Sequence, residues 1–280
     1  MITTLTTADG LALHVHAWPA AAPGHGTVLL VHGLGEHSGR YGRVAAHLDD
    51  RGWNVVGYDQ RGHGRSGGPR GAVRESDDLL RDLALVIDAV RARQPGTLLL
   101  LGHSLGGLVA ARFVAEALAA EPAPWSRPVD GLALSSPAFD PGMNALQKIA
   151  LSVARPLAPD VAVSNGLKPA WISRDPAVVR AYRDDPLVHD RITPRLARFA
   201  VDAAAHVAAL APRWSVPTLL LYAGDDRCVA PRGSAAFAAA APRSALTAQG
   251  FPGLYHEIFN EPEHARVFEV LDAWLLRQVR

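Results

Sequence analysis

The sequence contains a single cysteine, Cys228, and only two lysines, Lys148 and Lys168, among 280 residues. One cysteine excludes an intrachain disulfide, a composition that fits a reducing compartment. The 28 basic residues, nearly all arginines, are balanced by 27 acidic ones, and the formal net charge is +1. Because no basic cluster stands out, we expect no nucleic acid as a partner.

Long hydrophobic runs are also missing. No stretch approaches the roughly 18 uninterrupted apolar residues of a membrane-spanning helix. Residues 1–6 have neither the basic start nor the apolar core of a signal peptide. We therefore expect a cytoplasmic protein. With 49% hydrophobic and 20% charged residues, the chain can bury a sizeable core.

Buried strands and amphipathic helices alternate along most of the chain. Such alternation is typical of an α/β fold, in which a mostly parallel central sheet is flanked by helices. The apolar patterns predict strands at 11–18, 27–31, 54–58, 97–101, 129–135, 218–222 and 244–249. They predict helices at 40–50, 76–94, 104–121 and 262–279, and in the alanine-rich runs 203–211 and 235–241.

The most informative motif is a strand, a tight turn and a helix in direct succession. The leucines of 97–101 run into Gly102-His103-Ser104-Leu105-Gly106, after which apolar residues recur at helical spacing. A Gly-x-Ser-x-Gly turn in this setting exposes the serine hydroxyl above the sheet edge. We predict Ser104 to be a nucleophile. Ser66 lies in a second Gly-x-Ser-x-Gly, but no helix follows it, and we interpret it as a loop serine.

A serine nucleophile needs an imidazole to take its proton and a carboxylate to orient that imidazole. His256 follows the last predicted strand and is the predicted base, whereas His264 falls inside the last helix and is expected at the surface. The acid is Asp225 or Asp226, which follow the strand at 218–222. Position alone does not choose between these two aspartates.

Acyl-transfer enzymes of this architecture hold the developing oxyanion with two backbone amides. One amide belongs to the residue after the nucleophile, which is Leu105. The other comes from a glycine-containing loop after an early buried strand, and here the strand at 27–31 is followed by His32-Gly33-Leu34-Gly35. We predict the amides of Leu34 and Leu105 to form the oxyanion hole.

The strand pattern disappears from residue 139 to residue 214. An amphipathic helix is expected at 145–158, and prolines divide the rest into short helices and loops. We interpret this segment as a helical lid over the strand ends, since it is short for an independent second domain. The predicted organisation is a core segment 1–138, a cap 139–214 and a second core segment 215–280.

The motifs that would indicate a cofactor or a metal are weak. Gly62, Gly64 and Gly67 match a dinucleotide fingerprint, but no helix begins there, and we expect a turn whose backbone is hydrogen-bonded by Asp59 and Arg61. His256-Glu257 has no second histidine at position 260, and the pair His14 and His16 has no third ligand nearby. We expect no cofactor and no metal.

Five blocks of the sequence together resemble a known family. They are His32-Gly33-Leu34-Gly35-Glu36-His37-Ser38-Gly39-Arg40-Tyr41, Asp59-Gln60-Arg61-Gly62-His63-Gly64-Arg65-Ser66, Gly102-His103-Ser104-Leu105-Gly106-Gly107, Asp185-Pro186-Leu187-Val188 and Tyr255-His256-Glu257. Over residues 10–275 the chain resembles the monoacylglycerol lipase and lysophospholipase group of α/β-hydrolases. The resemblance implies a helical cap inserted after the sixth strand.

The same resemblance implies an activity and a set of site residues. It places the triad acid at Asp226 and the oxyanion amides at Leu34 and Leu105. It implies hydrolysis of a carboxylic ester through an acyl-enzyme, with no metal and no cofactor. The implied partner is a small-molecule acyl ester, a monoacylglycerol or a similar single-chain ester, entering beneath the lid. The apolar face of the lid could also contact a membrane surface.

Other activities fit the same residues. A general carboxylesterase, a lysophospholipase, a perhydrolase and a carbon–carbon bond hydrolase all use this triad, whereas dehalogenases and epoxide hydrolases would have an aspartate at position 104. From another class, a ligand receptor could keep the fold and turn over little. Cys228, two residues beyond Asp226, is either a thiol that makes the enzyme sensitive to modification or a packed structural side chain.

Overall fold

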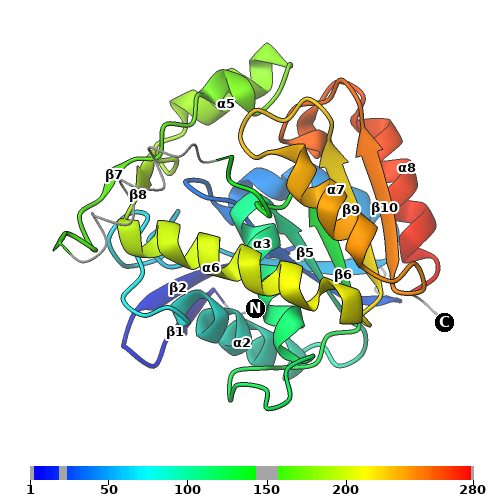
Figure 1. Cartoon of the computed structure of the whole chain (residues 1–280), viewed down its shortest axis with the longest axis horizontal. Helices are drawn as coiled ribbons and strands as arrows, with labels where there is room; N and C mark the ends of the chain where they lie inside the picture. The colour runs from blue at the N-terminus through cyan, green and yellow to red at the C-terminus, as the bar shows by residue number, and fades with distance from the viewer. Residues whose placement is uncertain (1–2, 19–23, 143–156, 279–280) are drawn as a thin grey trace.

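The computed structural model describes residues 3–18, 24–142 and 157–278. Within them, one eight-stranded sheet has the order β1-β2-β4-β3-β5-β6-β9-β10 (Figure 1). Its strands are β1 (Thr4–Thr6), β2 (Ala12–Trp18), β3 (Gly26–Val31), β4 (Trp53–Tyr58), β5 (Leu98–His103), β6 (Gly131–Ser135), β9 (Thr218–Ala223) and β10 (Leu246–Phe251). The predicted α/β fold is confirmed.

The sheet is parallel from β4 to β10, and only β1 and β2 run antiparallel to their neighbours. The seven strands predicted from the sequence all form. Strand β1 was not predicted, because three mostly exposed residues are too few to show an alternating pattern. With β1 included, the insertion follows β6, which is the sixth strand along the chain.

Helices cover both faces of the sheet (Figure 1). Helices α2 (Asp78–Arg91), α3 (Ser104–Glu116), α6 (Pro194–Leu210) and α7 (Pro231–Ala240) contribute to one apolar cluster, and α1 (Gly42–Asp49) and α8 (His264–Leu275) to the other. Along β5, Leu98 and Leu100 pack into the first cluster, and Leu99 and Leu101 pack into the second. The leucine run is therefore buried on both faces, as its composition predicted.

The closing helix is shorter than predicted. It ends at Leu275, and the next residue, Leu276, is 71% exposed. Leu276, although apolar, therefore does not share the buried face of this helix. The buried face of this helix consists of Val267, Phe268, Leu271, Trp274 and Leu275.

The insertion contains more than helices and loops. It includes η2 (Pro169–Trp171), α5 (Pro176–Asp184) and a small antiparallel pair, β7 (Val163–Ser164) with β8 (Arg191–Ile192). The expectation of a segment without strands is wrong for this pair, because two-residue strands leave no pattern in the sequence. The helix predicted at 145–158 lies almost entirely outside the described residues. The three-segment division stays a prediction.

The turn between β5 and α3 is possible only with glycines. Ser104 has a φ of +53°, in the left-handed region that side chains other than glycine rarely adopt. A Cβ atom at Gly106 would lie 2.1 Å from Val31 O and 2.2 Å from His32 O. Gly106 therefore lets α3 approach the end of β3, which brings the loop after β3 next to Ser104.

We expect the substitution Gly106→Ala to cost about 3 kcal/mol or more of folding stability, because its methyl group would meet backbone rather than a movable side chain. Thermal unfolding of the purified variant measures this. The matched control is Gly42→Ala, where a Cβ atom would meet nothing within 4 Å. Equal melting temperatures for the two variants would show that the close approach at Gly106 is not needed.

Candidate active site

Ser104 opens onto a pocket of about 380 Å³, counting the open space at its mouth. From the core, Leu34, Ser104 and His256 line this pocket. From the insertion, Ile172 and Tyr182 line it as well. The structure thus brings the predicted nucleophile Ser104, the predicted base His256 and one predicted oxyanion residue, Leu34, to one cavity. The segment interpreted as a lid covers this cavity.

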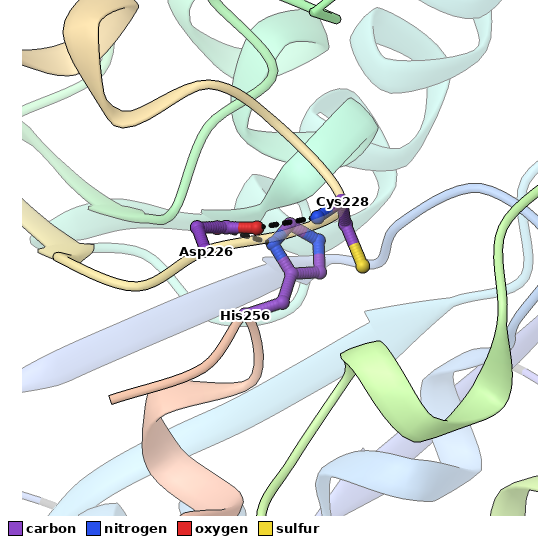
Figure 2. A group of neighbouring side chains, drawn as sticks. All are labelled: Asp226, Cys228 and His256. Atoms are coloured by element: carbon purple, nitrogen blue, oxygen red, sulfur yellow. Dashed lines mark hydrogen bonds and ion pairs between the residues drawn. The ribbon is translucent and has the colours of Figure 1, made fainter. Parts of the chain in front are cut away.

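The predicted base and one of the two candidate acids form a buried pair (Figure 2). His256 Nδ1 lies 2.7 Å from Asp226 Oδ2, and the two side chains are 6% and 1% exposed. The other oxygen of Asp226 accepts hydrogen bonds from the backbone amides of Cys228 and Val229, at 2.8 and 3.0 Å. Asp225 is exposed instead, so the geometry favours Asp226 as the partner of His256.

The charge of Asp226 decides the protonation behaviour of His256. Burial acts to lower the pKa of His256, but attraction and hydrogen bonding to the adjacent Asp226 carboxylate, together with smaller effects of Glu257 and Glu36, hold this pKa above its usual value. His103, whose ring centroid lies 4.6 Å from that of His256, behaves oppositely. Burial first, and then repulsion from His256, lowers the pKa of His103 to about 4. Near neutral pH, His103 is therefore an uncharged neighbour.

The two predicted oxyanion amides belong to two segments that meet at Ser104. Leu105 is the second residue of α3, where a helical amide has no acceptor within its own helix. Leu34 belongs to the loop after β3, and a methyl group placed on Gly33 would lie 3.1 Å from Ser104 Cβ. The loop therefore passes within contact distance of the nucleophile.

The second Gly-x-Ser-x-Gly is structural, as predicted. Ser66 is buried, donates a hydrogen bond to Asp59 O and accepts one from the amide of His14. Asp59 accepts from the amides of Ser38 and Arg65, so its predicted role in the turn backbone is confirmed.

For Arg61 the expectation was wrong. Its guanidinium forms ion pairs with the carboxylates of Asp78 and Asp82, at 2.8 and 2.6 Å, rather than with the turn backbone. The two aspartates lie at the start of α2 and one turn further on. Arg61 thus joins the loop after β4 to α2, a link between segments that the local pattern did not reveal.

Cys228 also lines the pocket and lies beside the His256–Asp226 pair (Figure 2). Potential ligand atoms of these three side chains lie within 4.8 Å of one another. Burial raises the pKa of the Cys228 thiol, and thiolate is the form that binds metals and reacts with electrophiles. Because His256 Nδ1 is already bonded to Asp226, the arrangement favours a hydrogen-bonded pair beside a protonated thiol.

Three charged residues near the pocket belong to the sequence blocks that carry the family resemblance, but no role was predicted for them from the sequence. They are Glu36, Arg40 and Glu257, which form a buried ion-pair chain. Glu36 and Arg40 have the i,i+4 spacing of a helical ion pair, and this spacing could have indicated their contact from the sequence. Their link to Glu257 has no local signal, because 217 residues separate Arg40 from Glu257.

An elbow serine at the carboxyl end of a central parallel strand, followed along the chain by an aspartate and then a histidine that pair with each other, defines an α/β-hydrolase. Residues 22–263 match the family described as "Serine aminopeptidase, S33". The chain belongs to this family.

Within this family the chain is similar to monoacylglycerol lipases. It is 32% identical to the monoacylglycerol lipase of Mycolicibacterium smegmatis over 95% of this chain and 94% of that protein. The crystal structure of Paleococcus ferrophilus monoacylglycerol lipase has 33% identity and a TM-score of 0.84, covering 95% of this chain and 99% of that one. The resemblance stated from the motifs is confirmed.

A further relative is much longer than this chain. An uncharacterised abhydrolase domain-containing protein of Dictyostelium discoideum is 30% identical over 99% of this chain, which spans only 29% of that protein's length. The similarity therefore concerns only part of that relative.

Proposed function

We infer that the chain is a carboxylic ester hydrolase that cleaves monoacylglycerols or similar single-chain acyl esters. The observation that carries this inference is the buried pair of His256 and Asp226 on the same pocket as Ser104. Its support from outside the chain is the 32% identity, over nearly full length, to a monoacylglycerol lipase.

The first half of the reaction forms an acyl-enzyme. Ser104 Oγ attacks the ester carbonyl while His256 Nε2 takes the hydroxyl proton. Asp226 accepts from His256 Nδ1 and stabilises the imidazolium that forms. The amides of Leu34 and Leu105 donate to the carbonyl oxygen as it becomes negative. His256 then returns the proton to the departing alcohol oxygen, and the acyl group stays on Ser104.

The second half releases the acid. A water molecule gives its proton to His256 Nε2 and attacks the acyl carbonyl, and the same two amides again hold the oxyanion. Collapse of this intermediate breaks the bond to Ser104 Oγ, which regains its proton from His256. The cycle needs no metal and no cofactor, because every proton transfer goes through one imidazole.

The insertion acts as the lid. Leu167, Ile172 and Tyr182 line the pocket from this segment, so an acyl chain reaching Ser104 would lie against them. Three apolar side chains of the insertion, Leu157, Val161 and Val163, are 78%, 58% and 50% exposed. They give the lid an apolar outer surface for brief contact with a membrane, from which single-chain esters would enter.

Among the described residues, no helix has both the length and the apolarity to cross a bilayer. The single cysteine supports a cytoplasmic location.

One observation favours a second substrate class, the lysophospholipids. Lys168 lines the same pocket, is exposed, and holds its ammonium 5.4 Å from the centroid of the Trp171 ring. An ammonium at the pocket mouth would attract the phosphate of a lysophospholipid headgroup.

The substrate series tests both classes. We expect kcat/KM for long-chain monoacylglycerols to exceed that for chain-matched lysophospholipids by about 10-fold, with Lys168→Met lowering only the lysophospholipid rate. Rates on monoacylglycerols of increasing length, p-nitrophenyl esters and a lysophospholipid measure this. Activity restricted to small activated esters would instead identify a general carboxylesterase, and no turnover at all would favour a ligand receptor.

A further inference from the structure

A buried chain of ion pairs borders the active site and takes no part in the reaction as written above. Arg40 Nη1 lies 2.7 Å from Glu36 Oε2 and 2.7 Å from Glu257 Oε1, and Arg40 Nη2 lies 2.9 Å from Glu257 Oε2. The side chains of Glu36, Arg40 and Glu257 are 5%, 11% and 7% exposed. One guanidinium thus joins two carboxylates that belong to distant parts of the chain.

One end of this chain holds the oxyanion loop. Glu36 Oε1 accepts a hydrogen bond of 2.6 Å from the amide of Gly33 and one of 2.7 Å from the hydroxyl of Tyr41. Gly33 immediately precedes Leu34, whose amide is the proposed oxyanion donor. The Glu36 carboxylate therefore holds the His32–Gly33 peptide, one residue before the peptide that carries the Leu34 amide.

The other end holds the loop of the catalytic histidine. Glu257 directly follows His256, and its backbone amide donates to Ile172 O in the insertion. Its carboxylate forms a bidentate ion pair with Arg40, which restricts its position more than a single contact would. The position of Glu257 therefore limits where His256 can lie.

The positive charge of Arg40 also compensates the negative charges of Glu36 and Glu257, which burial would otherwise disfavour. Burial acts to raise the pKa of Glu36, but attraction to Arg40, together with smaller effects of His103, His32 and the Tyr41 hydroxyl, outweighs it and lowers this pKa to about 2. The ring of Tyr182, from α5 of the insertion, covers the guanidinium with its centroid 4.7 Å away. An isolated charge in such surroundings is strongly destabilising, so the three ionised groups depend on one another.

We propose that Arg40 is a positioning residue for ester hydrolysis: by joining Glu36 to Glu257 it holds the oxyanion loop and the catalytic histidine in a fixed relation to Ser104. The proposal rests on the proposed function. An oxyanion hole accelerates a reaction only when its donors are already aimed at the developing charge, and a shift of about 1 Å can cost about 100-fold in rate. Arg40 supplies this preorganisation without contacting the substrate.

The proposal has an electrostatic consequence for His256. The charged and titratable groups around this histidine are Asp226 and Cys228 after β9, His103 at the end of β5, Glu36 and Arg40 after β3, Lys168 and Tyr182 in the insertion, and its neighbour Glu257. Attraction to Asp226, and less strongly to Glu257 and Glu36, raises the pKa of His256 against the effect of burial. Loss of the Arg40 charge would leave two carboxylates uncompensated and raise this pKa further, whereas loss of the Glu257 charge would lower it.

The experiment compares three variants with the wild type. Arg40→Met removes the charge, Arg40→Lys keeps the charge but not the planar bidentate geometry, and Glu257→Gln removes one carboxylate and nearly preserves shape. The matched control is Arg51→Met, which removes an ion pair away from the site. Arg51 Nε lies 2.7 Å from Asp272 Oδ1, and the two side chains are 39% and 25% exposed. Each variant is assayed for kcat and KM on a long-chain monoacylglycerol, with a pH profile of kcat/KM and a melting curve.

We expect Arg40→Met to lower kcat by about 10- to 100-fold with little change in KM, since the interaction lost matters only in the transition state. Activity requires neutral His256 and falls below its pKa, so the acid limb of kcat/KM reports that value. Relative to the wild type, we expect this limb to move to higher pH in Arg40→Met and to lower pH in Glu257→Gln. In Arg40→Lys, which keeps the positive charge, the limb should lie closer to that of the wild type than in Arg40→Met. Arg51→Met should leave kcat and the limb unchanged.

Opposite shifts of the acid limb in Arg40→Met and Glu257→Gln would support the proposal, since a merely structural role would move neither. The proposal is overturned if both variants keep the wild-type kcat and acid limb. If Arg40→Met does not fold, Arg40→Lys and Glu257→Gln decide by the same two readouts. Ser104→Ala, run in the same assay, separates the two levels: if it stays active, the proposed function itself is wrong, whatever Arg40 does.

Discussion

Replacement of Ser104 by alanine is expected to lower kcat/KM for ester hydrolysis by at least about 10⁴-fold, to the level left by substrate binding and the oxyanion amides. The hydroxyl is the only group of this residue that the reaction needs. Alanine keeps the Cβ atom that the φ of +53° already accommodates, so we expect an unchanged melting temperature. Turnover of a monoacylglycerol and acyl-enzyme formation, followed by mass spectrometry, measure the effect.

The chain contains its own control for this substitution. Ser66 lies in the other Gly-x-Ser-x-Gly, and its hydroxyl bonds Asp59 O and the amide of His14. We expect Ser66→Ala to keep near-wild-type activity while losing about 1 to 2 kcal/mol of stability, because the carbonyl of Asp59 and the partly buried amide of His14 lose a partner. An active Ser104→Ala together with an inactive Ser66→Ala would reverse the assignment of the nucleophile.

The second large effect is expected for Asp226→Asn, which should lower kcat by about 10³- to 10⁴-fold. The amide oxygen of asparagine can keep the hydrogen bonds from Cys228 and Val229, which leaves its NH₂ group facing His256 Nδ1. Two donors cannot face each other, so His256 would adopt the tautomer with its proton on Nε2. That nitrogen could then no longer take a proton from Ser104.

Asp225→Asn is the matched control, since it makes the same chemical change one residue away. Asp225 is exposed, and we expect its substitution to change kcat by less than about threefold. Parallel kinetics of the two variants, with melting curves to exclude unfolding, decide the point. A larger loss in Asp225→Asn than in Asp226→Asn would move the triad acid by one residue.

The features predicted correctly from the sequence are those that depend on neighbours along the chain. The leucine run of β5, the glycines of the elbow and the first turns of α3 are contiguous, so a local pattern contains the whole structural requirement. The sequence also distinguished the predicted nucleophile Ser104 from the loop serine Ser66, because a helix directly follows only Ser104. The class of the protein followed from these motifs, and the comparisons confirm it as an α/β-hydrolase similar to monoacylglycerol lipases.

Features that depend on contacts between distant segments were open or missed. The choice between two adjacent aspartates depends on how one turn orients its side chains, and only the folded loop directs Asp226 toward His256. Arg61 was assigned to the turn backbone, whereas it pairs with two carboxylates of α2. The packing of α6 against α3 could not be read from its alanine-rich sequence either, although its helical character could.

By itself, the sequence determined the order of seven of the eight strands of the main sheet, the position of the elbow serine and the residue types available to act on an ester, because each of these depends on local periodicity and turn chemistry. Only the tertiary structure decided which aspartate meets His256 and that Arg40 lies between Glu36 and Glu257. The physical reason is that hydrogen bonds and ion pairs require a few ångströms between atoms, and the fold alone sets such distances for residues far apart in the chain.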